Sequence, residues 1–315
     1  MRFRQLTALI LIAFLTLPAI GQSRRNANNA SANLPQGPIP VVSDPKARLL
    51  ESLRLNSSLL NRAVKYSVYL PPDYYVTNRR YPVVYLLHGY SDDETGWVQF
   101  GEADRIADAG IESGEIPPMI IVMPDAEVTW YMNDYQAKTR YEDMFMQEFI
   151  PHIDSTLRTR TNRAYRAVSG LSMGGHGSLL YAMHRPDLFG NCAALSAAVF
   201  TDESITGMDT TNYNRRFAFL LGPGVGQERL TNHWKRNSPL TLAKSAPEGD
   251  LKRVRWWLDC GDDDFLTNAN ALLHIAFNDR KVPHEYRVRD GAHTWSYWRT
   301  GLPDALKFIG VGFRR

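Results

Sequence analysis

Short strand-like runs and longer helical stretches alternate along most of this chain. The strand-like runs lie at 81–87, 119–123, 164–169, 192–199, 253–258 and 285–288. The first two are continuously apolar, as expected of strands that are covered on both faces. Helical spacing of apolar residues appears at 101–111, 141–157, 175–183 and 268–278, and a C-terminal helix follows the last strand. This alternation predicts a mostly parallel, doubly wound α/β sheet.

Two further segments modify this picture. Residues 50–60 and 63–70 alternate polar and apolar positions and end at Pro71-Pro72, which predicts two antiparallel edge strands before the parallel part. Residues 201–250 are polar and interrupted by Gly and Pro, so they form either a lid or binding insertion or a plain surface excursion. We therefore expect one α/β domain over 46–315.

The first 45 residues differ from the rest of the chain. Arg2 and Arg4 precede an apolar stretch at 8–20 and a small-x-small site at 19–21, a pattern typical of a cleavable signal peptide over 1–21. An N-terminal membrane anchor is the alternative interpretation. Residues 22–45, rich in Asn, Ser, Gln and Pro, are expected to be a flexible leader. The chain is therefore predicted to be periplasmic or secreted, without stable membrane insertion after cleavage.

Charge and cysteine content narrow the function further. The chain has 36 basic and 33 acidic side chains, and without Arg2 and Arg4 the basic count is 34. This near balance offers no electrostatic footprint for nucleic acid or an anionic membrane. The two cysteines, Cys192 and Cys260, fall in apolar strand-like runs, which favours buried free thiols, although an exported protein leaves a disulfide open.

Candidate chemistry begins at 170–174, where the sequence is Gly-Leu-Ser-Met-Gly. A predicted strand leads directly into this motif and a predicted helix leads out of it. A nucleophile on such a sharp strand-to-helix turn needs glycine neighbours, because a Cβ on either side would clash across the turn. We therefore expect Ser172 to be a nucleophile, with the N–H of Met173 available to a developing oxyanion.

A serine nucleophile requires a base, and the position of His293 favours it for that role. His293 follows the last predicted strand, so it lies at the carboxyl edge of the sheet with Ser172, and it comes last in the chain, in the order Ser, acid, His. Structural roles are expected for the other histidines, with His233 a weak candidate for the base. These residues are His88, His152, His176, His184, His233, His274 and His284.

The orienting acid should leave the strand that precedes the last one. Asp262, Asp263 and Asp264 all occupy that place, and local spacing does not choose among them. A cation site is a weaker interpretation of the same run. A second oxyanion donor should come from the loop after the strand at 81–87, where Gly89 permits close approach and the N–H of Tyr90 is the candidate.

These motifs together resemble the esterase-D-like esterase family, and within it carbohydrate esterase family one. The matching sequences are Leu-Leu-His-Gly at 86–89, Gly-Leu-Ser-Met-Gly-Gly at 170–175, Cys-Gly-x-x-Asp at 260–264 and Gly-Ala-His at 291–293. The resemblance runs from about Lys65 to the C-terminus and implies an α/β-hydrolase fold. It implies Ser172, His293 and Asp264 as catalytic residues, Tyr90 and Met173 as oxyanion donors, and no metal or cofactor.

The family also implies a substrate class. Its feruloyl and acetylxylan esterases act on esterified polysaccharide, and aromatic residues suited to stacking on a feruloyl ring or a sugar are Trp130, Tyr131 and Trp295. Ordinary packing is the alternative role for each of them. We expect ester hydrolysis through an acyl-enzyme. An acyltransferase of the mycolyltransferase type and a catalytically silent carbohydrate-binding relative remain the alternatives.

Overall fold

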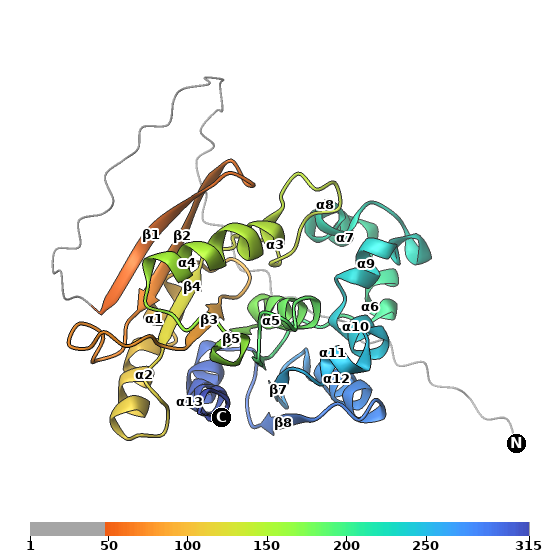
Figure 1. The fold of residues 1–315 in the computed structure, drawn as a ribbon. Coiled ribbons are helices and arrows are strands. Elements are labelled where there is room, and N and C mark those ends of the chain that lie inside the picture. The colour runs from red at the N-terminus through yellow and green to blue at the C-terminus, as the bar shows by residue number, and fades with distance from the viewer. Residues whose placement is uncertain (1–47, 315) are drawn as a thin grey trace, which may run out of the picture. The chain divides into compact units, whose positions relative to one another are not determined.

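The computed structural model describes residues 48–314, which are built around one eight-stranded sheet (Figure 1). Its strands lie in the order β1-β2-β4-β3-β5-β6-β7-β8. The pairs β1/β2 and β2/β4 are antiparallel, and every later pair is parallel. The strands are β1 (Leu49–Ser57), β2 (Arg62–Tyr69), β3 (Val83–Leu87), β4 (Ile120–Pro124), β5 (Arg166–Leu171), β6 (Asn191–Leu195), β7 (Arg255–Gly261) and β8 (His284–Arg289).

The predicted fold class is confirmed, with a mostly parallel sheet and antiparallel strands at its N-terminal edge. The continuous apolar runs are buried on both faces, as their sequence indicated. Along β3, Val83, Tyr85 and Leu87 enter one hydrophobic core, whereas Val84 and Leu86 enter the other. The predicted signal peptide at 1–21 and leader at 22–45 lie outside the described residues.

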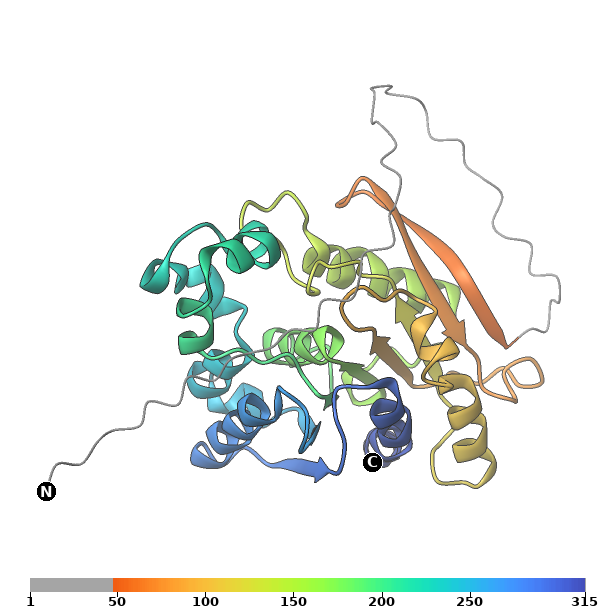
Figure 2. The ribbon, with the colours of Figure 1, turned by 180° about the vertical axis from the view of Figure 1, so that it is seen from behind.

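Helices cover both faces of the sheet (Figures 1 and 2). One core contains residues of α1 (Gly96–Gln99), α2 (Ala103–Glu112) and α13 (Trp295–Phe313). The other contains residues of α3 (Tyr141–Met144), a π-helical turn at Phe145–Phe149, α4 (Ile150–Thr156), α5 (Met173–His184) and α12 (Thr267–Asp279). Within residues 48–314, no helix has the length and apolar character needed to span a membrane.

The segment at 201–250 folds into a group of short helices. They are α6 (Asp202–Thr206), α7 (Thr210–Arg216), α8 (Ala218–Leu221), α9 (Asn232–Arg236), α10 (Pro239–Ser245) and α11 (Glu248–Leu251). The buried Arg229 holds the group together: its guanidinium donates to the carbonyls of Ile205, Met208 and Gly224 and lies 4.0 Å from the centre of the Tyr213 ring. A lid function for this segment stays a prediction.

Two predicted boundaries are wrong in an informative way. The strand expected at 192–199 ends at Leu195, because Ser196 adopts a left-handed conformation (φ 42°) and turns the chain away. The N–H of Ala198 then donates to the Ser172 carbonyl at 2.9 Å instead of continuing the sheet. The helix expected from 175 begins two residues earlier, at Met173, so it follows Ser172 without a spacer.

Both cysteines are free and buried, as the apolar context favoured. Burial raises the pKa of the Cys260 thiol to about 12 and moves the pKa of Cys192 in the same direction. A thiol with a raised pKa is protonated at neutral pH and is therefore a poor nucleophile. Neither cysteine is therefore a candidate nucleophile.

His184 connects the short helices to the rest of the fold. Its Nδ1 lies 2.7 Å from Glu142 Oε1 of α3, and its Nε2 lies 2.9 Å from the Arg236 carbonyl oxygen of α9. Only the charged ring carries both protons that these two acceptors require. Burial opposes that charge, but the hydrogen bond to Glu142 and its negative charge outweigh burial, so the pKa of His184 is raised.

Replacing His184 by glutamine should therefore remove a pH-dependent part of the stability. The charged ring stabilises the fold fully below its unfolded pKa of about 6.5, and this contribution is lost as pH rises through the higher folded pKa. The free energy of unfolding of the wild type minus that of His184→Gln should therefore be largest below about pH 6.5 and should fall as the pH is raised from there into the alkaline range. Urea titrations across this range measure it.

His152→Gln is the matched control, because burial lowers the pKa of His152. Its neutral folded form predicts the opposite trend, with stability lost as pH falls. A difference between wild type and His184→Gln that does not change with pH would contradict the charged state of His184.

Candidate active site

Ser172 occupies a strained turn between β5 and α5. Strand β5 ends at Leu171, α5 begins at Met173, and Ser172 itself has φ 52° and ψ −114°, which is an unfavourable region for a residue with a Cβ. Three backbone hydrogen bonds hold it there: its N–H donates to the Leu195 carbonyl, and its carbonyl accepts from His176 and Ala198. The side chain is left half-buried at the carboxyl end of the strand.

The two glycines of the motif are required by close packing. A Cβ on Gly170 would lie 2.7 Å from the carbonyl oxygens of Gly174 and Leu87, and one on Gly174 would lie 2.2 Å from the Leu87 oxygen. A Cβ essentially never lies this close to a backbone oxygen, so any side chain would push β5, β3 and α5 apart. The steric reason for glycine on both sides of Ser172 is therefore present in the structure.

The structure brings Ser172, His293 and Asp264 together, although 121 residues separate the serine from the histidine. His293 Nε2 lies 2.9 Å from Ser172 Oγ, and His293 Nδ1 lies 2.8 Å from Asp264 Oδ2. A carboxylate only accepts, so these contacts assign the proton to Nδ1 and leave Nε2 as the acceptor for the serine hydroxyl. The arrangement is that of a nucleophile, a base and an orienting acid.

The structure distinguishes between the three consecutive aspartates that the sequence left open. The Asp264 side chain is fully buried, and its second oxygen accepts from the Leu266 N–H at 2.9 Å. Asp262 is exposed, and its Oδ1 accepts from the Gly291 N–H at 3.0 Å, which fastens the loop that carries His293. Asp263 is also exposed, and its backbone N–H donates to the Gly291 carbonyl.

Asp262, Asp263 and Asp290 form an exposed acidic cluster whose carboxylate atoms lie within 4.8 Å of one another. Exposed carboxylates commonly lie this close without a bound cation. The first of them already has a structural task in holding Gly291. This geometry therefore does not strengthen the interpretation of the three consecutive aspartates as a cation site.

The loop after β3 approaches the nucleophile closely. A Cβ on Gly89 would lie 2.6 Å from Leu171 Cδ1 and 3.8 Å from Ser172 Cβ, so glycine is what allows the loop to pass here. Tyr90 follows directly, with its ring half exposed. Met173 is the first residue of α5, where a backbone N–H has no acceptor within the helix. The two predicted oxyanion donors thus belong to two elements, the loop after β3 and the start of α5, and their role stays a prediction.

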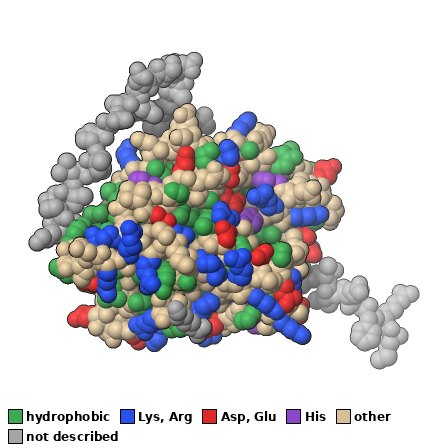
Figure 3. Space-filling view, in the orientation of Figure 1, with side chains coloured by type: hydrophobic (Ala, Val, Ile, Leu, Met, Phe, Trp, Pro, Cys, Tyr) green, Lys and Arg blue, Asp and Glu red, His purple; other side chains and the backbone are tan. Residues whose placement is uncertain are grey.

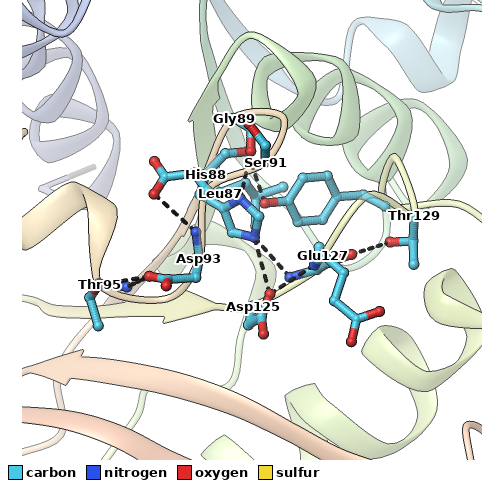
Figure 4. A network of polar contacts seen from close by, with 12 residues as sticks. Leu87, His88, Gly89, Ser91, Asp93, Thr95, Asp125, Glu127 and Thr129 are labelled. Carbon is cyan, nitrogen blue, oxygen red and sulfur yellow. Dashed lines mark hydrogen bonds and ion pairs between the residues drawn. The ribbon is translucent and has the colours of Figure 1, made fainter. Parts of the chain in front are cut away.

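The His88 side chain holds this loop in place through hydrogen bonds at both ring nitrogens (Figure 4). Its Nε2 accepts from the Ala126 N–H at 2.8 Å, and its Nδ1 lies 2.7 Å from the Gly89 carbonyl oxygen, to which it donates. The Tyr131 hydroxyl donates to the His88 carbonyl at 3.0 Å. His88 therefore shapes the loop, as its place at the end of a strand indicated.

The three aromatic residues predicted to bind substrate have different surroundings. Tyr131 is fully buried, and its hydroxyl is engaged with His88, so it supports the loop and has no face to offer a ligand. Trp130 is 7% exposed and packs against Tyr90, His176, Phe200 and Phe217. Trp295 is half-buried beside Trp97, Phe100 and Trp298. Substrate binding by Trp130 and Trp295 stays a prediction.

The remaining histidines have structural partners within the described residues. His176 donates from Nδ1 to the Ala198 carbonyl at 3.0 Å, and burial lowers its pKa to about 4, so the ring is neutral. His152 bonds to the Tyr66 hydroxyl, and His274 bonds to His284. His233 packs against Tyr135, whereas the imidazole within hydrogen-bond distance of Ser172 is that of His293.

Two aromatic neighbours of His293 were not predicted from the sequence. The imidazole lies between Phe265 and Trp298, with ring centres 4.7 and 4.8 Å away. Phe265 directly follows Asp264, and Trp298 lies one turn into α13 after the N-cap residue Thr294. The sequence feature that could have identified these two rings is their position near the predicted acid and the predicted base.

Comparisons with known proteins agree with this geometry. A family model described as "Putative esterase" matches residues 57–309. The endo-1,4-beta-xylanase/feruloyl esterase of Xylanibacter ruminicola is 34% identical over 158 residues, which cover 47% of this chain and 21% of that protein. The acetyl esterase of Caldicellulosiruptor saccharolyticus is 23% identical over 242 residues, covering 74% of this chain and 85% of that protein. The chain thus spans about a fifth of the first of these relatives.

Solved structures extend the likeness over most of the chain. A ferulic acid esterase superimposes with a TM-score of 0.73 at 32% identity, covering 84% of this chain and 98% of the other. A ferulic acid esterase of Anaeromyces mucronatus, at 21% identity and a TM-score of 0.61, covers 82% of this chain and 90% of its own and shares the fold. The family match, the shared fold and the esterase relatives agree: this chain belongs to the "Putative esterase" family of α/β-hydrolase-fold ester hydrolases.

Proposed function

We propose that this chain is an exported serine esterase that removes feruloyl or acetyl groups from plant cell-wall xylan. Membership of the esterase family supplies the reaction class, the hydrolysis of carboxylic esters. The observation that carries the mechanism is the hydrogen-bonded series from Ser172 Oγ through the His293 imidazole to Asp264. Each atom in it has the donor or acceptor state that nucleophilic catalysis requires.

Acylation follows from this geometry. His293 Nε2 takes the proton of Ser172 as the serine oxygen attacks the ester carbonyl carbon. The negative charge that develops on the carbonyl oxygen is held by the N–H groups of Met173 and Tyr90. The charged imidazole then gives its proton to the leaving alcohol oxygen, which departs and leaves an acyl group on Ser172.

Deacylation repeats the same steps with water. His293 removes a proton from a water molecule, whose oxygen attacks the acyl carbonyl, and the same proton returns to Ser172 as the acid product leaves. Asp264 keeps the proton on Nδ1 through both halves and stabilises the charged ring. Because the Asp264 carboxylate is fully buried, its interaction with the imidazolium is little weakened by water.

The substrate assignment rests on relatives and on the site surroundings. Among the solved structures, the ferulic acid esterase at 32% identity covers most of this chain, so feruloyl esters come first. The acetyl esterase among the curated relatives supports acetyl groups as the second choice. Exposed aromatic side chains beside Ser172 and His293, namely Tyr90 and Phe265, suit an aromatic acyl group or a sugar.

The proposal also includes export from the cell and a polysaccharide, not a nucleic acid, as the binding partner. The basic and apolar pattern of 1–21 supports a signal peptide, and an esterified polysaccharide is a substrate found outside the cell that uses it. Lys and Arg side chains are interspersed with Asp and Glu on the face seen in Figure 3, where a nucleic-acid surface would gather one sign of charge.

Replacing Ser172 by alanine should abolish hydrolysis of a chromogenic acetate ester while preserving the fold. Loss of the nucleophile of a triad lowers kcat by on the order of 10⁶-fold. Stopped-time absorbance assays measure the rate, and circular dichroism with thermal unfolding checks that the variant folds like the wild type. Activity within tenfold of the wild type would exclude Ser172 as the nucleophile.

Asp264→Asn should lose far more activity than Asp262→Asn. The first change reverses the tautomer preference of His293 and lowers kcat by about 10⁴-fold. The second keeps the Oδ1 acceptor for the Gly291 N–H and should change kcat by only a few-fold. Steady-state kinetics of the two variants on one ester measure the difference, and equal losses would refute the assignment of Asp264 as the acid.

A substrate panel tests the acyl group. We expect hydrolysis of methyl ferulate and of acetylated xylan, with a higher kcat/KM for the feruloyl ester than for a short-chain aliphatic ester. Released ferulate and acetate are quantified by chromatography. If only the aliphatic ester is hydrolysed, the protein is a general carboxylesterase, and the proposal that it acts on cell-wall polysaccharide is wrong.

A further inference from the structure

His293 belongs to a band of aromatic rings that reaches solvent at both ends. From one end to the other, ring centres are 4.7 Å apart from Phe265 to His293, 4.8 Å from His293 to Trp298, 5.5 Å from Trp298 to Trp295 and 5.6 Å from Trp295 to Phe100. Phe265 is 68% exposed and Phe100 is 49% exposed. We call Phe265, Trp298, Trp295 and Phe100 the aromatic band.

Large exposed rings require an explanation at this place. Phe265 directly follows the buried Asp264, and Phe100 ends the short helix α1 next to Trp97, so backbone turns hold both at the surface. Folding alone would gain more from burying them, because each phenyl ring adds apolar surface to water. Their contact with the base and its neighbours points to a ligand that covers them.

The chemistry of the site indicates which part of the ester lies here. His293 Nε2 receives the serine proton and passes it to the leaving alcohol oxygen, so that oxygen must come within hydrogen-bond distance of His293. The acyl part lies instead with its carbonyl oxygen toward Tyr90 and Met173. Phe265, the exposed ring beside His293, therefore faces the alcohol part of the ester, whereas Trp298 is buried behind the imidazole.

The charge beside Phe265 indicates the class of alcohol. Asp262, Asp263 and Asp290 are all exposed and lie on the two loops that carry Asp264 and His293. Carboxylates repel an alcohol that bears phosphate or carboxylate groups, whereas they accept hydrogen bonds from hydroxyl groups. At the other end of the band, Arg299 is paired with Glu102 at 3.1 Å and adds little net charge.

We propose that the aromatic band binds the neutral sugar part of the ester, with Phe265 and Phe100 stacking on sugar rings on either side of the scissile bond's alcohol oxygen. The flat apolar faces of sugar rings match phenyl and indole faces, and their hydroxyl groups match the acidic rim. This inference rests on the esterase function proposed above and names the residues that distinguish a polysaccharide ester from a simple one.

Phe265→Ala and Phe100→Ala test the proposal in the full chain. The measured quantity is the ratio of kcat/KM for a feruloylated arabinoxylo-oligosaccharide to kcat/KM for methyl ferulate, which shares the acyl group but lacks the sugar. Loss of one stacked ring should lower this ratio about three- to tenfold, mainly through KM for the oligosaccharide. Phe219→Ala is the matched control, since Phe219 is 51% exposed on α8 beside the 134–138 loop.

The control should keep the wild-type ratio. A Phe265→Ala variant that loses activity equally on both esters would mean that the ring only supports His293, and it would overturn the proposal. An unchanged ratio in both aromatic variants would overturn it as well. Because Phe265 and Phe100 are exposed, neither truncation removes a core contact that folding requires.

A binding measurement separates this inference from the esterase function. In the Ser172→Ala background, calorimetric titration with the unesterified arabinoxylo-oligosaccharide should give a Kd that rises three- to tenfold on adding Phe265→Ala. If the Kd for the oligosaccharide is the same with and without Phe265→Ala, the proposed sugar site is wrong, but the proposed esterase function is not affected. If instead the Kd rises on adding Phe265→Ala but the wild type hydrolyses neither ester, the proposed esterase function is wrong and the sugar site is supported.

Discussion

The site depends on one strained residue and the close packing that maintains it. Ser172 has φ 52° and ψ −114°, a conformation that costs a residue with a Cβ about 1–3 kcal/mol. The surrounding structure leaves no alternative: Gly170 and Gly174 pack against β3 at distances that exclude any Cβ. Since the turn connects β5 to α5 without a spacer, the proposed nucleophile Ser172 and the N–H of Met173, the proposed oxyanion donor, are adjacent.

The rest of the site is assembled around this turn by the parallel sheet. Strands β3, β5, β7 and β8 end on one edge and deliver Gly89, Ser172, Asp264 and His293 respectively. Behind this edge, the buried Asp259 receives two hydrogen bonds from Arg289, at 2.8 and 2.9 Å, which ties β7 to β8 below the His293 loop. A loop fastened this way holds His293 within hydrogen-bond distance of Ser172, so the proposed mechanism needs no ordering of the loop at each turnover.

The sequence singled out Ser172 and His293, which the structure brings within hydrogen-bond distance, because each carries a positional signal. Ser172 lies between a strand and a helix, and His293 follows the last strand. Asp264 carried no such signal among three consecutive aspartates, and only the family resemblance selected it. The structural difference lies in burial and in the N–H of Leu266, neither of which leaves a trace in local spacing. Phe265 was missed because a single exposed ring has no periodicity.

The helices at 201–250 could not be predicted from the spacing of apolar residues in the sequence. They are four to seven residues long, too short for the spacing of apolar positions to repeat. Their stability comes from tertiary contacts such as those of Arg229 and His184, which join residues distant in the sequence. Similarly, Tyr131 is buried among residues distant in the sequence, such as His88 and Tyr181, so the sequence alone could not separate a packing role from a binding role.

In the proposed mechanism, Ser172 carries the acyl group during turnover. The most direct measurement is rapid acid quenching of the enzyme with methyl ferulate, followed by peptide mass spectrometry in the wild type and in Ser172→Ala. The mechanism predicts a feruloyl adduct on the peptide containing Ser172 in the wild type and no adduct on that peptide in the variant. An adduct on another residue, or hydrolysis that continues at the wild-type rate in Ser172→Ala, would contradict it.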